Sequence, residues 1–146
     1  MNIQSKLPIA ARVLLGLVFF VFGLNGFLNF IPVPPHTGAA ATFMGGLAAS
    51  GYFFPLLKSL EVLAGLALLS GRFVPLALLV LAPIVVNIFA FHVIAGGLAM
   101  PIVLVALGLY LAWSYRDAFR GVLNPHAKPV EPEASVEVNR TAPQGA

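Results

Sequence analysis

Two long apolar runs dominate the pattern of hydrophobic and polar residues along the chain. No Asp, Glu, Lys or Arg occurs between Arg12 and Lys58, or between Arg72 and Arg116. A helix crosses roughly 30 Å of hydrocarbon with about 20 apolar residues, so each run is long enough for more than one crossing. Prolines and paired glycines divide the runs, because they interrupt helices.

The breaks predict an all-α membrane protein, a four-helix bundle. Its spans are expected over residues 10–31, 52–71, 73–95 and 99–119. Residues 38–50 are apolar but too short to cross, and we expect a short helix there that lies along the interface or partly re-enters the bundle. A plain covering loop is the alternative. Residues 1–120 thus form one transmembrane domain, and residues 121–146, rich in proline and glutamate towards the end, are expected to be a disordered cytoplasmic tail.

Composition supports the membrane assignment and excludes several kinds of chemistry. Of 146 residues, 60% are hydrophobic and 9% are charged, whereas soluble domains carry about 25% charged residues. The absence of cysteine excludes disulfides, thiolate nucleophiles and iron–sulfur clusters. His92 is the one histidine expected at membrane depth. Haem held by two histidines would need a second one there, and a lone histidine does not form a metal site, so we expect neither.

The basic residues predict how the bundle is oriented. Four crossings place the loop and terminal cations on one side: Lys6, Arg12, Arg72, Arg116, Arg120 and Lys128. Short cytoplasmic loops carry an excess of Lys and Arg, so both termini are expected in the cytoplasm. The cations are scattered along the sequence, and we expect no nucleic-acid partner.

Five polar residues at membrane depth are the candidate ligand or proton site. Inserting an ionisable group at the bilayer centre costs about 2.5–3.5 kcal/mol of free energy, so the presence of Glu61 there suggests a function or a partner. Lys58 lies one turn away on the same helical face and can pair with it. Counting residues from the span ends puts Asn25, Asn87 and His92 in the same layer, so we expect the five side chains to form one cluster. No catalytic residue is assigned.

A structural explanation of the same residues stays open. Lys58 can extend to the membrane surface, and Glu61 can be protonated and bonded to the backbone. Asn87 can satisfy the Leu79 carbonyl that Pro83 leaves without its amide partner.

Four segments in order resemble the DoxX family of small integral membrane proteins. They read RVLLGLVFFVFGLNG over 12–26, EVLAGLALLSGRF over 61–73, LAPIVVNIFAFH over 81–92 and YRDAF over 115–119. The resemblance implies a four-helix protein of the bacterial inner membrane and, for some relatives, association with quinone-linked sulfur oxidation or other redox partners. Relatives often carry a Lys near the end of the first span, where this chain has Asn25-Gly26-Phe27.

Three functions are compatible with these observations. The first is an accessory subunit that binds a small molecule such as a quinone beside Glu61 and Lys58, in the bilayer, with other redox subunits or as a homo-oligomer. The second is a proton- or solute-coupled transporter that works as an oligomer, and the third is a structural scaffold. An autonomous enzyme ranks last, since no residue set supplies both a nucleophile and a stabiliser of developing charge.

Overall fold

The computed structural model describes residues 3–129, and within that range the chain is all-helical without strands. The five α-helices are α1 (Ile3–Leu28), α2 (Gly38–Ala49), α3 (Phe53–Ser70), α4 (Val74–Ala95) and α5 (Ala99–Ser114), followed by the short 3-10 helix η1 (Arg116–Phe119). The helix predicted over 38–50 is therefore present as α2, and the covering-loop alternative is wrong.

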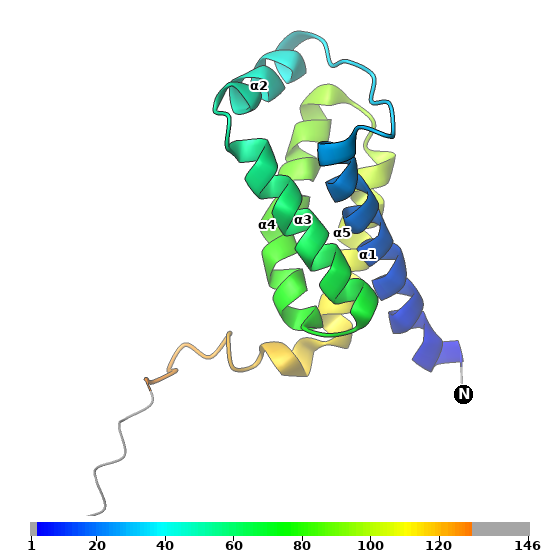
Figure 1. The fold of residues 1–146 in the computed structure, drawn as a ribbon. Helices are drawn as coiled ribbons and strands as arrows, with labels where there is room; N and C mark the ends of the chain where they lie inside the picture. The colour runs from blue at the N-terminus through cyan, green and yellow to red at the C-terminus, as the bar shows by residue number, and fades with distance from the viewer. Residues whose placement is uncertain (1–2, 130–146) are drawn as a thin grey trace, which may run out of the picture.

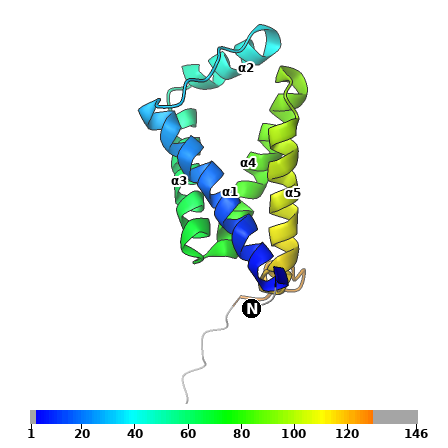
Figure 2. The ribbon, with the colours of Figure 1, turned by 90° about the vertical axis from the view of Figure 1, so that its right-hand side faces the viewer.

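Four helices run lengthwise and the fifth crosses one end of them (Figure 1). α1 packs most extensively on α3, α4 contacts both α3 and α5, and α5 returns to α1. α2 contacts α3 and α4 at the end opposite the N-terminus and η1. Seen from the side, the α1/α3 pair and the α4/α5 pair separate towards α2 (Figure 2). We call the two ends of the bundle the α2 end and the termini end.

Three of the four predicted spans have the length and composition to cross a membrane. These are Lys6–Leu28 with 23 residues, Phe53–Ser70 with 18 and Val74–Ala95 with 22. α5 is apolar but has 16 residues, which at 1.5 Å per residue reach about 24 Å. The fourth crossing stays a prediction.

The first helix and its predicted span have different ends. The first helix ends at Leu28 and not at 31, because Asn25 folds the following chain back: its Nδ2 donates to the Ile31 carbonyl (3.1 Å) and its Oδ1 accepts from the Ile31 amide (2.6 Å). Asn29 then adopts a left-handed conformation, with φ 49°, which ends helices. The same helix begins at Ile3, before the predicted start of the span at residue 10, so the helix is longer than that span at its N-terminal end.

The chain after residue 114 also differs from the prediction. α5 ends at Ser114, and the expected last turn over 116–119 is the separate helix η1. Residues 120–129 form exposed turns. The remainder of the predicted tail, 130–146, lies outside the described residues, so its disorder stays a prediction.

Glycines allow the backbones of α1 and α3 to touch. A Cβ on Gly65 would lie 2.6 Å from the Phe20 amide nitrogen, and one on Gly23 would lie 3.0 Å from the Val62 nitrogen. A Cβ on Gly16 would meet Leu68 at 3.0 Å. Towards the termini end this contact continues into a core of fully buried leucines, namely Leu15, Leu68, Leu81 and Leu111. Small residues at such positions are how membrane helices approach closely.

We expect Gly65→Ala to lower the thermal unfolding midpoint of the purified protein, because the new methyl group forces the α1 backbone away from α3. Overpacking of this kind costs about 1–3 kcal/mol. Gly108→Ala in α5 is the matched control, since no atom lies within 4 Å of a Cβ built there. Equal midpoints for the two variants would contradict the close α1–α3 packing.

A candidate ligand cavity beneath α2

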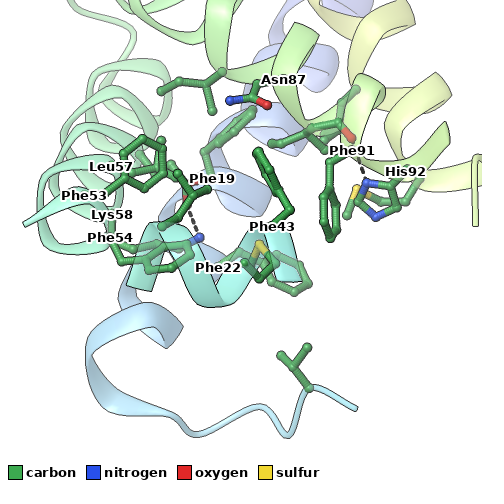
Figure 3. Close-up of a pocket in the computed structure, with 18 of the residues that line it drawn as sticks. Phe19, Phe22, Phe43, Phe53, Phe54, Leu57, Lys58, Asn87, Phe91 and His92 are labelled. Carbon is green, nitrogen blue, oxygen red and sulfur yellow. Dashed lines mark hydrogen bonds and ion pairs between the residues drawn. The ribbon is translucent and has the colours of Figure 1, made fainter. Parts of the chain in front are cut away.

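A cavity of about 500 Å³ lies where the two helix pairs separate under α2. All five helices and the segment before α2 contribute to its wall, and Figure 3 shows its lining. Ligand pockets in proteins usually measure about 300–1,000 Å³. The cavity is therefore large enough for a small organic molecule.

Aromatic rings make up much of the wall. Phe19, Phe22, Phe43, Phe54 and Phe91 all line the cavity. The Phe91 ring meets the Phe43 ring at a centroid distance of 5.8 Å and the His36 ring, edge-on, at 5.1 Å. Such walls favour a flat apolar ligand, because aromatic pairs pack well in stacked or edge-to-face arrangements.

Lys58 and Glu61 form an ion pair in this wall. Lys58 Nζ donates to Glu61 Oε2 at 2.7 Å, as their i,i+3 spacing predicts. The Glu61 side chain is only 4% exposed, against 23% for Lys58. The carboxylate is thus more deeply buried than the ammonium group, which keeps further N–H donors beyond its bond to Glu61.

Gly26 provides the space for the Lys58 side chain. A Cβ at Gly26 would overlap Lys58 Cγ and would lie 2.6 Å from Cδ. The methylene stem of Lys58 therefore crosses α1 at a residue without a side chain, which holds the ammonium group next to Glu61.

His92 faces the cavity with one defined hydrogen bond. Its Nδ1 lies 2.7 Å from the Ile88 carbonyl oxygen. A carbonyl can only accept, so Nδ1 carries the proton, and Nε2 of the neutral ring is left as an acceptor. In Figure 3, Phe91 and His92 lie on the α4 side and Lys58 and Phe54 on the α3 side.

Asn87 also lines the cavity, and its amide makes no hydrogen bond to another described residue. The proposed repair of the break at Pro83 by Asn87 is therefore absent. Both the donor and the acceptor of this amide are available to a ligand.

Asn25 does not join the other four predicted site residues. It is 6% exposed, and its side chain is occupied by the Ile31 backbone. Counting residues predicts a depth for Asn25 but could not give the direction of its side chain. The prediction also missed His36, which the segment 29–37 brings back to the cavity wall. Nothing local in the sequence signals that return.

We expect Lys58→Met to destabilise the protein strongly, by about 3–5 kcal/mol, because it leaves a buried carboxylate without its partner. The double variant Lys58→Met/Glu61→Gln should recover most of this loss in thermal unfolding. Arg120→Gln breaks an exposed pair with Asp117 and should cost less than about 1 kcal/mol. A single Lys58 variant as stable as wild type would contradict the buried pair.

Comparison with known proteins agrees with this architecture. The DoxX family model matches residues 7–94, a range that holds α2, α3 and most of α1 and α4. It includes Lys58, Glu61, Asn87 and His92. No curated protein and no solved structure matches the chain. The matched range covers more than half of the chain, and with its apolar helices it identifies this membrane protein as a member of the DoxX family.

Proposed function

We propose that this protein is a binding subunit that holds a small flat molecule, such as a quinone, in the cavity beneath α2. The observation that carries the proposal is a cavity with apolar walls and three side chains with unused hydrogen-bonding capacity, namely Lys58, Asn87 and His92. Ligand sites combine apolar walls and few polar groups in this way.

The polar groups fit the chemistry of a quinone and its reduced form. Lys58 can only donate, which suits a quinone carbonyl. In a neutral His92 ring whose Nδ1 donates to Ile88, Nε2 accepts, which suits a quinol hydroxyl. The Asn87 amide can do either.

Packing at the termini end favours binding over transport by a single chain. The leucines that fill this end, among them Leu15, Leu68 and Leu111, are almost fully buried, so the described residues pack closely in that half. A pure scaffold would have no need of a cavity with free polar groups, since cavities weaken packing.

Family membership adds a cellular role and a location to the proposal. We propose an accessory role beside membrane redox enzymes, alone or as a homo-oligomer, in the bacterial inner membrane. Both termini lie in the cytoplasm in this proposal, which is supported by the basic residues of the termini end.

The double variant Lys58→Met/Glu61→Gln tests the proposal without leaving an unpaired charge. A decyl-substituted benzoquinone should bind purified wild-type protein in nanodiscs. The variant should bind it roughly ten- to a hundredfold more weakly, because a hydrogen bond from a charged donor contributes about 1.5–3 kcal/mol. Isothermal titration measures both affinities. Ser59→Ala, on the neighbouring exposed face of α3, is the control. The proposal would be refuted if the wild-type protein did not bind the quinone, or if the double variant bound it as tightly as wild type.

His92→Phe should weaken binding of the quinol more than binding of the quinone. Phenylalanine keeps the ring but removes the acceptor that a quinol hydroxyl uses. The same titrations with both redox forms measure the difference, and His126→Phe in the exposed segment after η1 is the control. If His92→Phe weakened binding of quinone and quinol equally, His92 would not be the acceptor for the quinol hydroxyl.

A further inference from the structure

Arg12 occupies an unusual position at the termini end, away from the cavity. It projects from α1 onto the turn between α3 and α4, where an ideal Cβ on Gly71 would overlap Nη1 and would lie 2.9 Å from Cζ. Gly71 has φ 72°, so glycine satisfies two demands here: the left-handed turn and the space for the guanidinium.

The guanidinium has no counter-charge in the described part of the chain. Glu61 and Asp117 are the carboxylate side chains of residues 3–129, and they pair with Lys58 and Arg120. Arg12 is partly buried, and its Nε is buried without a hydrogen-bond partner among the residues described. Since buried donors are nearly always bonded, an unpaired one points to a partner other than the described residues.

The surroundings of Arg12 indicate what that group is. Arg72 follows Gly71 directly in the turn. At the same end, Arg116 donates to the Trp113 carbonyl at 3.1 Å, and its guanidinium carbon lies 5.1 Å from the centre of the Trp113 ring. Tryptophan and arginine together are typical of the membrane interface, where lipid phosphates lie.

We propose that Arg12 binds the phosphate of an anionic phospholipid at the α3–α4 turn, with Arg72 as a second cation. The planar guanidinium offers five donors in a fork that matches phosphate oxygens. One surface of the guanidinium rests on Gly71, and the terminal Nη groups, which make no hydrogen bond to another described residue, are assigned to the lipid phosphate. This site is separate from the cavity and does not depend on the quinone proposal.

Thermal unfolding of the full chain in mixed micelles tests this site. Adding phosphatidylglycerol in place of phosphatidylcholine should raise the unfolding midpoint of wild type by about 4 °C, as expected for a ligand of the folded state. Arg12→Gln should lose most of that rise. Arg120→Gln removes a cation at the same end that is already paired with Asp117, and it should keep the rise.

The other outcomes overturn the proposal. If Arg12→Gln lowered the unfolding midpoint equally in both lipids, the role of Arg12 would be intramolecular. Its partner would then be the end of α3 or a residue outside the described range. If inorganic phosphate raised the unfolding midpoint as much as phosphatidylglycerol does, the site would bind free phosphate and the lipid proposal would be wrong. If Arg12→Gln fails to fold, native mass spectrometry of Arg12→Lys decides, because loss of the fork should lower retention of phosphatidylglycerol relative to wild type; unchanged retention would refute the site.

Discussion

The close contact between α1 and α3 is the constraint on which the rest of the structure depends. Glycines 16, 23 and 65 bring the two backbones together along most of their length. A hydrophobic driving force is weak between helices in lipid, so close van der Waals packing has to hold them. With this pair fixed, α4 and α5 can lean away at the α2 end, and the cavity opens between the pairs.

The same contact also orients the charged pair. Because Gly26 has no side chain, the Lys58 stem can cross α1 and bring its ammonium group to Glu61. A buried carboxylate is tolerated only with a partner and good geometry. The carboxylate is more deeply buried than the ammonium, so the pair adds a hydrogen-bond donor to a mostly apolar wall that also holds Asn87 and His92.

The two ends of the bundle differ in packing and in charge. The α2 end is hollow and lined by aromatic rings, whereas the termini end is filled by leucines and surrounded by basic residues. The first suits an apolar guest with a polar head, and the second suits the headgroup region of a membrane. This division of roles follows from where the helix pairs meet and where they separate.

The sequence by itself determined the helical class and the long apolar helices, which follow from composition and breakers. It favoured the short helix before α3 over a covering loop, and its i,i+3 spacing allowed the Lys58–Glu61 pair. Residue counting gives depth along a helix but not the direction of a side chain. Only the tertiary structure therefore decided that Asn25 folds its own chain back, that His36 returns to the cavity and that Arg12 meets Gly71. Each depends on contacts between segments that are brought together by packing, which no local pattern encodes.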